Sequence, residues 1–600
     1  MKIKLAKFIA DFFVDHDIKH MFTLTGGGAM HLNDAFGHKE GLTCIYNHHE
    51  QACAIAAEGY TRLSGKLAGI CVTSGPGGTN ALTGVLGGWL DSIPMFIISG
   101  QVKRETTLWA TDVPLRQLGD QEFNIVDCVK TMTKYAYMVT EPQDILYHLQ
   151  KALYLCKNGR PGPVWLDIPL DVQASVIDTE HLRQFSPYEL ESIEEPVYDS
   201  KLTSQIIEKI QTAKRPVILA GTGIRLANAH DEFIRCIEKL QIPVVTAWNA
   251  HDVLWDEHPL YCGRPGTVGT RGGNFIVQNC DLLLVLGCRM NIRMISYNYK
   301  DFAKDAFKII VDIDENELQK PTIHPDMAVH ADVKDVMNAL IQSDYVYNQS
   351  QDQWLQWCRY INKKYPATLE SYYTRNEMLN PYVFITELCK ALDHDDAVIT
   401  GNGSACVITF QAANIKKGQR YFTNSGCAAM GYGFPAAIGA CVQRDGKRTV
   451  CIDGDGSFQM NLQELQTVVY NNLNLKIFYL NNNGYHSIRQ TQTNLFEPPL
   501  VGVCDGNGLS FPDAEKIAYA YGLPFVRIDA VDSIQEKLSK VLDEDGPVFC
   551  EVVVDPTQNF EPKLSSKVLP DGKIVSPPID DMYPFLPKEE YEKNKKMIMD

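Results

Sequence analysis

The stretch Arg448-Thr449-Val450-Cys451-Ile452-Asp453-Gly454-Asp455-Gly456-Ser457 decides the fold, together with Leu475–Leu480 and the Asn481-Asn482-Asn483-Gly484-Tyr485 that follows. Residues 448–452 and 475–480 are short apolar runs, which predict two buried parallel strands. The apolar residues between them recur at helical spacing, namely Leu462, Leu465, Val468 and Val469. A strand, a helix and a second parallel strand would bring both functional ends to the carboxyl edge of one sheet, where ligands bind.

The residues after these two strands suit a diphosphate and a divalent cation. Gly454 and Gly456 let the backbone pass close to a phosphate, and Ser457 is expected to open a helix whose free N–H groups face an anion. Mg²⁺ takes hard oxygen ligands, with diphosphate oxygens and water completing its octahedron. The predicted metal ligands are Asp455, Asn482 and the main-chain carbonyl of Gly484. Each half alone is also explained as an ordinary turn, because Gly, Asp and Asn are turn formers.

Length and composition indicate a soluble globular chain of three or four domains. The 600 residues are 45% hydrophobic, enough for each domain to bury its own core. The 73 acidic residues exceed the 56 basic ones, so neither nucleic acid nor a membrane surface is expected as a partner. The seventeen cysteines form no Cys-x-x-Cys pair, and Met1–Phe13 resembles an amphipathic helix rather than a signal peptide. A cytoplasmic location is therefore expected.

Alternating strand and helix signals predict three doubly wound α/β domains with parallel sheets, over residues 1–185, 195–345 and 375–555. An acidic linker is expected over 189–199, and a tail over 556–600 that lies on the surface and ends frayed. The charge-free stretch Ala68–Leu90 is long enough to span a membrane. Its internal Gly-Pro-Gly-Gly would break such a helix, so a buried strand, a turn and a helix are predicted instead. The first and third domains could share one fold.

Further segments indicate which enzyme family the chain resembles. They are His49-Glu50-Gln51, the loop Thr73-Ser74-Gly75-Pro76-Gly77-Gly78-Thr79-Asn80, Asp91-Ser92-Ile93-Pro94, Ser99-Gly100-Gln101-Val102, Gly401-Asn402-Gly403-Ser404-Ala405 and Ala428–Gly439. Together with Asp455 and Asn482, they resemble the large catalytic subunit of acetohydroxyacid (acetolactate) synthase, a thiamin-diphosphate-dependent enzyme.

This resemblance implies an N-terminal pyrimidine-binding domain, a central domain and a C-terminal diphosphate- and Mg²⁺-binding domain. The implied cofactor contacts are Gly27, Gly28, Glu50, Thr73, Gly75, Asn80, Gly403, Ser404, Ala405, Ala428, Met430, Gly454, Asp455, Gly456, Ser457, Asn482, Gly484 and Tyr485. The catalytic candidates are Glu50, His49, Gln121 and His486.

Glu50 carries the chemistry that the resemblance implies. In that family, the glutamate at this position hydrogen-bonds the aminopyrimidine ring of thiamin diphosphate. A carboxylic acid there favours the imino tautomer, whose exocyclic nitrogen takes the proton from the thiazolium carbon. For an isolated His-Glu-Gln triplet, a helix-capping carboxylate is the alternative, and for Met430 the alternative is core packing.

Segments of the central domain resemble those that hold FAD in this family, namely Ala220–Gly223, Arg264–Gly269, Gly287–Arg289 and Asp312–Asp314. The candidate flavin contacts are Arg160, Gly221, Arg289 and Asp312. The Gly221-Thr222-Gly223 piece lacks the third glycine of a dinucleotide fingerprint. FAD in a structural role, ADP and no nucleotide therefore all stay open.

The departures from the family cluster in the substrate pocket. Asp120 replaces an aromatic residue, Leu170 replaces a lysine, and Thr491 replaces the acceptor-selecting tryptophan. After Asn481-Asn482, the sequence Asn483–Ser487 replaces the expected Glu-Glu-Gln-Gly-Met. These changes are expected to enlarge and polarise the pocket. Such a pocket suits a polar substrate, because a polar substrate needs paired donors and acceptors once water is excluded.

The sequence therefore predicts a 2-oxo acid decarboxylating carboligase that passes a two-carbon unit, from pyruvate, to a polar carbonyl acceptor such as a keto-sugar or a 2-oxo acid. A non-ligating decarboxylase or a C–C hydrolase of the same superfamily is the alternative. A regulatory or assembly subunit is a third hypothesis, and the presence of Glu50, Asp455 and Asn482 counts against it. The family pairs the Glu50 and Asp455 motifs across subunits, so a homodimer or homotetramer is expected.

Overall fold

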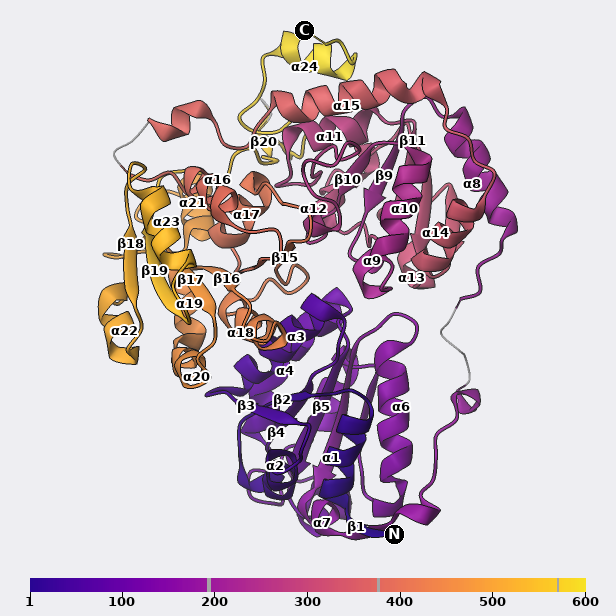
Figure 1. The fold of residues 1–600 in the computed structure, drawn as a ribbon, viewed down its shortest axis with the longest axis vertical. Helices are drawn as coiled ribbons and strands as arrows, with labels where there is room; N and C mark the ends of the chain where they lie inside the picture. Colours follow the sequence, from indigo (N-terminus) through magenta and orange to yellow (C-terminus); the bar gives the residue numbers. More distant parts are fainter. Residues whose placement is uncertain (191–195, 375–377, 569–570, 600) are drawn as a thin grey trace.

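The computed structural model describes residues 1–190, 196–374, 378–568 and 571–599, and contains three bodies, each built on a parallel sheet (Figure 1). The N-terminal sheet has the order β3 (Thr43–Tyr46), β2 (His20–Thr23), β4 (Gly69–Val72), β5 (Met95–Gln101), β7 (Pro163–Pro169) and β6 (Tyr135–Met138). The C-terminal sheet has the order β15 (Arg420–Phe422), β14 (Ala397–Thr400), β16 (Thr449–Gly454), β17 (Leu475–Asn481), β19 (Val548–Val553) and β18 (Phe525–Ile528). Both sheets connect their strands in the same way, which agrees with a fold shared by the first and third domains.

The central sheet runs β10 (Val244–Thr246), β9 (Pro216–Ala220), β11 (Leu282–Leu286), β12 (Phe307–Asp312) and β13 (Met327–His330). All its strand pairs are parallel, so the predicted α/β fold class is confirmed. The boundaries between domains stay a prediction, since the expected linker 189–199 falls largely on residues 191–195, outside the described ranges.

The helix predicted between β16 and β17 is interrupted. It consists of α19 (Asp455–Phe458), a 3-10 segment over Gln459–Glu464 and α20 (Leu465–Tyr470), with non-helical φ and ψ at Asn461. The Asn461 amide donates to the Gly431 carbonyl at 2.7 Å and to Gln51 Oε1 at 3.2 Å. The Glu464 carboxylate accepts from the Asn47 side chain and the His48 N–H, both at 2.9 Å. These bonds, most of them to the N-terminal body, offset the lost helical bonds, and no local sequence pattern predicts them.

Helix α3 (Glu50–Ser64) packs backbone to backbone against α18 (Gly433–Gln443), and both lie between the N-terminal and C-terminal bodies (Figure 1). A Cβ atom at Gly59 would overlap the Ala436 carbonyl, and one at Gly439 would overlap the Ala56 carbonyl. Larger residues at either glycine would push the helices apart. The middle of α3, the helix that begins at Glu50, is thus held against the C-terminal body.

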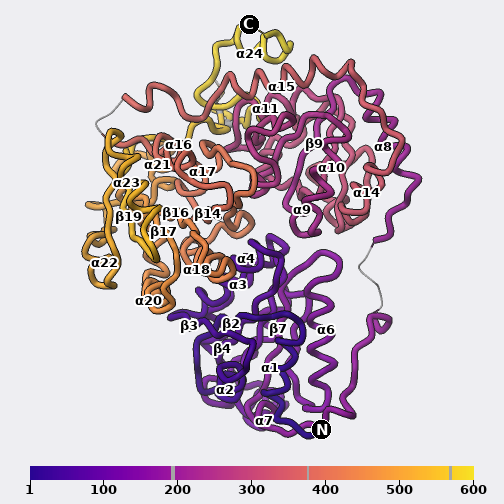
Figure 2. Tube along the Cα trace, in the orientation of Figure 1, coloured from indigo at the N-terminus to yellow at the C-terminus, as the bar shows by residue number. Residues whose placement is uncertain are grey.

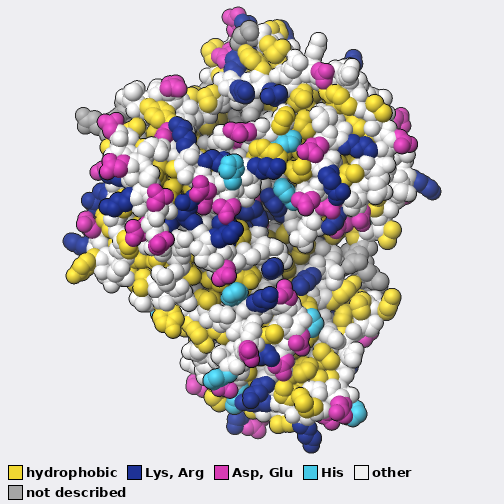
Figure 3. Space-filling view, viewed as in Figure 1, with side chains coloured by type: hydrophobic (Ala, Val, Ile, Leu, Met, Phe, Trp, Pro, Cys, Tyr) yellow, Lys and Arg dark blue, Asp and Glu magenta, His cyan; other side chains and the backbone are white. Residues whose placement is uncertain are grey.

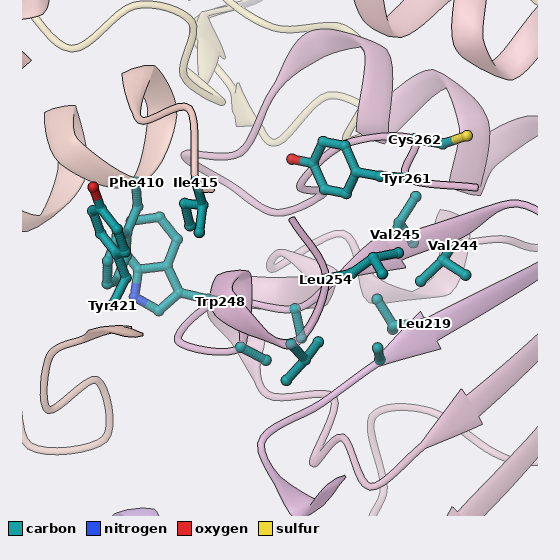
Figure 4. Close-up of a cluster of buried hydrophobic side chains, with 14 of the residues drawn as sticks. Leu219, Val244, Val245, Trp248, Leu254, Tyr261, Cys262, Phe410, Ile415 and Tyr421 are labelled. Atoms are coloured by element: carbon teal, nitrogen blue, oxygen red, sulfur yellow. The ribbon is translucent and has the colours of Figure 1, made fainter. Parts of the chain in front are cut away.

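The central and C-terminal bodies share one apolar core. Trp248 packs edge-on against Phe410 at 5.2 Å between ring centroids, with Ile415 and Tyr421 beside them (Figure 4). Arg264 is buried at this boundary and donates to the carbonyls of Phe410 and Ala413 and to Asp256. Its side chain therefore joins two bodies, although the sequence placed Arg264–Gly269 among the flavin-holding segments.

The C-terminal segment contacts the central body. Ile579 and Met582 are buried, and Arg271 of α11 (Arg271–Asn279) donates to the carbonyls of Met582 and Pro584. Near its C-terminus the chain forms α24 (Lys588–Lys595), beside α11 and α15 (Asp352–Lys364) (Figure 2). The tail predicted over 556–600 therefore packs against the central body, and its frayed end stays a prediction.

Ala68–Leu90 contains the fully buried strand β4 and most of α4 (Pro76–Asp91), as predicted. Among the described residues, no helix combines the length and apolarity needed to cross a bilayer.

His148 makes stability depend on pH. Its ring stacks on Tyr137 at 4.1 Å, and burial lowers its pKa to about 4 from 6.5. The unfolded chain binds the proton more readily, so this contribution is complete above pH 6.5 and is lost as pH falls toward 4. Between pH 6.5 and pH 4, the free energy of unfolding should fall by up to about 2 kcal/mol less in His148→Gln than in the parent protein. This figure allows for solvent screening of the partly exposed ring. Urea unfolding at both ends of the range measures this.

The exposed His324→Gln is the matched control and should keep the parent pH dependence. Equal pH dependence in the His148→Gln and parent proteins would contradict the assignment.

Candidate active site

Asp455 is the centre of a buried polar cluster at the carboxyl edge of the C-terminal sheet. It follows β16 directly and is 1% exposed. Its Oδ1 accepts from the Gly456 N–H at 2.7 Å, and its Oδ2 accepts from the Gly484 N–H at 2.9 Å. Burial raises the pKa of Asp455 to about 6, although these N–H groups act in the opposite direction. A cation would offset this cost of burying the carboxylate.

Asn482, at the end of the neighbouring strand β17, supplies a second oxygen. Its Nδ2 donates to Ser404 Oγ at 3.3 Å, whereas its buried Oδ1 has no hydrogen-bond partner in the part of the chain that the structure describes. A buried amide oxygen without a partner costs about 1–3 kcal/mol. The carboxylate, this amide oxygen and the Gly484 carbonyl are the donor types that Mg²⁺ takes, so these residues fit the ion.

The expected diphosphate turn lies beside this cluster. Gly403 has φ +60° and caps α17 (Ser404–Ala412), which places the free N–H groups of that helix at the sheet edge. A Cβ atom built at Gly403 would lie 3.4 Å from Ser487 Oγ, so this hydroxyl also faces the turn. The Tyr485 ring covers Gly456, where any side chain would collide with it. Ala405 is fully buried within α17.

Met430 and its neighbours form the wall next to this cluster. Ser457 lies within α19 rather than opening it, and its Oγ accepts from the Gly431 N–H at 2.9 Å. Ala428 is exposed with φ +52°, and its carbonyl accepts from the Asn402 amide at 3.2 Å. Met430 is only half-buried, so it is not an ordinary core residue.

Asp453 is a buried group that the sequence analysis missed. Its carboxylate packs against Gly401 and Gly433, and a side chain at Gly401 would overlap it. Burial raises the pKa of Asp453 to about 7. Its Oδ1 accepts from the Gly454 N–H at 2.9 Å, which shapes the turn before Asp455. A carboxylate in a run of apolar strand residues was the available signal.

Glu50 begins α3 and is 7% exposed. Its Oε2 accepts from the Asn80 amide at 3.0 Å. The helix cap is supplied by His49, whose Nδ1 accepts from the Gln51 N–H at 3.0 Å, so capping does not use the Glu50 carboxylate. The helix-capping alternative therefore applies to His49 rather than to Glu50.

The glycine loops of the N-terminal body lie around Thr73. The Gly28 N–H donates to Thr73 Oγ1 at 3.0 Å, and a Cβ atom at Gly27 would meet no atom within 4 Å. Gly75 has φ +59°, and a Cβ atom there would collide with the Gln121 carbonyl. Gln173, which the sequence analysis also missed, is fully buried and donates to the Gly28 carbonyl at 2.7 Å.

Gln121 is exposed and has φ +60°. The adjacent Glu122 is buried and accepts from the N–H groups of Leu108, Leu118 and Gly119. This carboxylate therefore shapes the loop over residues 103–124, and Gln121 is the member of the pair that remains accessible. The loop also exposes apolar side chains, namely Trp109, Val113, Leu115, Leu118 and Phe123.

His486 begins α21 (His486–Leu495) and packs edge-on against Phe560 at 5.2 Å. Burial and the nearby Arg489 lower its pKa to about 4. The imidazole is therefore neutral at pH 7 and would act there as an acceptor or a neutral donor.

A cavity of about 430 Å³ lies between the N-terminal and central bodies. Arg160, Arg289 and Asp312 line it, whereas Gly221 does not and instead packs against the Gly287 carbonyl. Arg160 NH1 lies 2.9 Å from both Asp314 and Glu317, so it joins the two bodies. The volume lies within the range of small-molecule sites.

Among the described residues, no hydrogen bond joins the Glu50–Asn80 pair to the Asp455–Asn482 cluster. Each half of the expected site is well formed, but the chain does not link them directly.

Comparison with known proteins agrees with this geometry. Residues 3–126, 203–340 and 401–552 match the family models of the thiamine pyrophosphate enzyme N-terminal TPP binding domain, central domain and C-terminal TPP binding domain. The acetolactate synthase large subunit of Cyanidium caldarium is 31% identical, over 93% of this chain and 94% of that protein. The isozyme 1 large subunit of Escherichia coli strain K12 is also 31% identical, over 93% and 95%. The probable acetolactate synthase large subunit of Methanocaldococcus jannaschii is 30% identical, over 97% and 96%. The chain therefore belongs to the thiamine pyrophosphate enzyme family and is similar within it to the acetolactate synthase large subunits.

Proposed function

We propose that this enzyme uses thiamin diphosphate and Mg²⁺ to decarboxylate pyruvate and to transfer the two-carbon unit to a polar carbonyl acceptor, a keto-sugar or a 2-oxo acid. The observation that carries the proposal is the pairing of two buried oxygen groups, the Asp455 carboxylate and the unpartnered Asn482 Oδ1. The names of the relatives support a carboligase.

When bound, thiamin diphosphate supplies a nucleophilic carbon that takes up and releases acyl units. Asp455, Asn482 and the Gly484 carbonyl would hold the metal, and Gly403 and Ser404 would contact the diphosphate. Glu50, positioned by Asn80, would hold a proton at the pyrimidine nitrogen. Met430 would support the bend of the cofactor.

The first turns of α21 favour a polar acceptor. Thr491 is exposed and its hydroxyl donates to the Ser487 carbonyl at 3.0 Å. With Ser487 facing Gly403, this side of the site presents hydroxyl groups where the family has methionine and tryptophan. A polar acceptor could pair with such groups after water is excluded.

The test supplies pyruvate labelled at its carboxyl carbon, with and without candidate keto-sugar and 2-oxo acid acceptors. Labelled carbon dioxide and a product with a new carbon–carbon bond are expected. Free acetaldehyde without ligation would instead support the decarboxylase alternative, and an absence of labelled carbon dioxide would overturn both.

We further propose that FAD occupies the 430 Å³ cavity in a structural role, and that the protein works in the cytoplasm. Arg289 and Asp312 line the cavity and would contact the nucleotide. An absorbance spectrum of the purified protein should show a flavin band. Adding pyruvate should leave this band unchanged, because a structural flavin is not reduced in the reaction.

We also propose a homodimer or homotetramer whose sites combine Glu50 of one subunit with Asp455 of another. The exposed apolar side chains of the 103–124 loop support a partner surface. Mixing Glu50→Gln and Asp455→Asn chains should then restore about a quarter of the parent activity, since half of random dimers are hybrids with one intact site. Activity of the mixture measures this, and hybrids isolated by two affinity tags after co-expression should show about half of the parent activity, since one of their two sites is intact. Inactive hybrids would show that each chain builds its own site.

A further inference from the structure

A second cavity, of about 250 Å³, lies where the three bodies meet, and we call it the junction cavity. Thr61 and Arg62 of α3 line it from the N-terminal body, Arg225 and Asn249 from the central body, and Arg420 from the C-terminal body. It adjoins the larger cavity, with which it shares Asn249 and other residues. Lys and Arg side chains gather along the junction of the lower body with the upper two in the face seen in Figure 3.

Three buried donor groups line the junction cavity without a hydrogen-bond partner among the described residues. They are the Thr61 hydroxyl, Arg225 Nε and Asn249 Nδ2. Their neighbouring atoms are used, since Arg225 NH2 donates to the Asp252 carbonyl at 2.7 Å and Asn249 Oδ1 accepts from the Thr423 N–H at 2.9 Å. Each unpartnered group costs about 1–3 kcal/mol, so three on one cavity indicate a site built for an acceptor.

The charges that line the junction cavity are mainly positive. Asp252 is its acidic residue, and its carboxylate accepts from Arg420 Nε at 2.6 Å while lying 3.9 Å from Arg225 Nε. Two arginines therefore share one carboxylate, and Lys157 adds a third positive charge at the cavity. Burial, with a contribution from Arg420, lowers the pKa of Arg225 to about 10. Arg62 is already paired with Glu58 and Asp91.

We propose that the junction cavity binds a small oxyanion, a phosphate or carboxylate group, through Arg225 Nε, Asn249 Nδ2 and the Thr61 hydroxyl. The cavity is slightly smaller than sites for drug-sized molecules, which suits a small anionic metabolite. Because the three donors come from two bodies, the bound anion would link the N-terminal and central bodies. Arg420 of the third body adds a positive charge nearby, although its own nitrogens already donate to Asp252, Leu63 and Arg62. The anion would also contact the helix that begins at Glu50.

The test titrates inorganic phosphate and malonate separately into the full-length protein saturated with thiamin diphosphate, Mg²⁺ and FAD, so that the other anion sites are filled. Calorimetry and thermal unfolding are the readouts, with sodium chloride at matched ionic strength. At least one oxyanion should bind and raise Tm. Binding of phosphate alone would indicate a phosphorylated ligand, and binding of malonate alone would indicate a carboxylate ligand. Arg225→Gln should weaken binding about tenfold or more, since hydrogen bonds to charged groups contribute about 1.5–3 kcal/mol.

Thr61→Val, which keeps the side-chain shape, should weaken oxyanion binding by a few-fold. If Arg225→Gln does not fold, the affinity of Thr61→Val alone tests whether these donors bind the anion. Arg235→Gln is the matched control, because that side chain is 58% exposed and lies outside the cavity. The proposal is overturned if neither oxyanion binds, or if binding is unchanged in Thr61→Val and in any folded Arg225→Gln protein.

Discussion

Replacing Glu50 by glutamine is expected to lower kcat/KM with pyruvate by about 10²–10⁴-fold, the usual contribution of a positioned proton-transfer group. Glutamine keeps the size of the side chain and can still accept from the Asn80 amide, which lies 3.0 Å from Oε2. It cannot share a proton with the pyrimidine ring. Steady-state rates measure the loss, and cofactor binding by fluorescence quenching should change far less.

The matched control is Glu536→Gln, an exposed glutamate of α23 (Ile534–Leu542), which should keep parent activity. If Glu50→Gln retained most of the parent rate with the cofactor bound, Glu50 would be only a structural group at the start of α3.

Asp455→Asn is expected to weaken Mg²⁺-dependent binding of thiamin diphosphate by at least about 100-fold, because even residues behind metal ligands contribute about 10–100-fold. The asparagine loses the negative charge, and its NH₂ group would face the N–H of Gly456 or of Gly484, both of which now donate to Asp455. Calorimetric titration of the cofactor at several Mg²⁺ concentrations measures this. Activity should fall in parallel and recover partly at high Mg²⁺.

The exposed Asp543→Asn serves as the control for removal of one carboxylate and should bind the cofactor as the parent does. An unchanged affinity and metal dependence in Asp455→Asn would exclude Asp455 as a metal ligand.

The sheets and the buried cluster of Asp455 and Asn482 could be predicted because their signals are local. The strands predicted over 448–452 and 475–480 correspond to β16 and β17, since buried parallel strands are continuous apolar runs. Asp455 and Asn482 meet because parallel neighbours end at one sheet edge, as expected for β16 and β17.

Other features depend on residues far apart in the chain. Asn461 interrupts its helix and donates to Gln51, and the Glu122 carboxylate accepts hydrogen bonds from N–H groups of the 103–124 loop. Burial and the nearby Arg489 lower the pKa of His486, and α24 packs beside α11 and the end of α15. No residue spacing in the sequence predicts these contacts.

By itself, the sequence determined three parallel α/β domains and the residue types of a thiamin-diphosphate site, because apolar runs and glycine-flanked polar residues act through local geometry. Only the tertiary structure decided which of those residues are accessible, which are already hydrogen-bonded, and where the three bodies enclose buried arginines. Those properties follow from burial and from partners supplied by other bodies, and they change the charge and the free hydrogen-bonding capacity of a side chain without changing its identity.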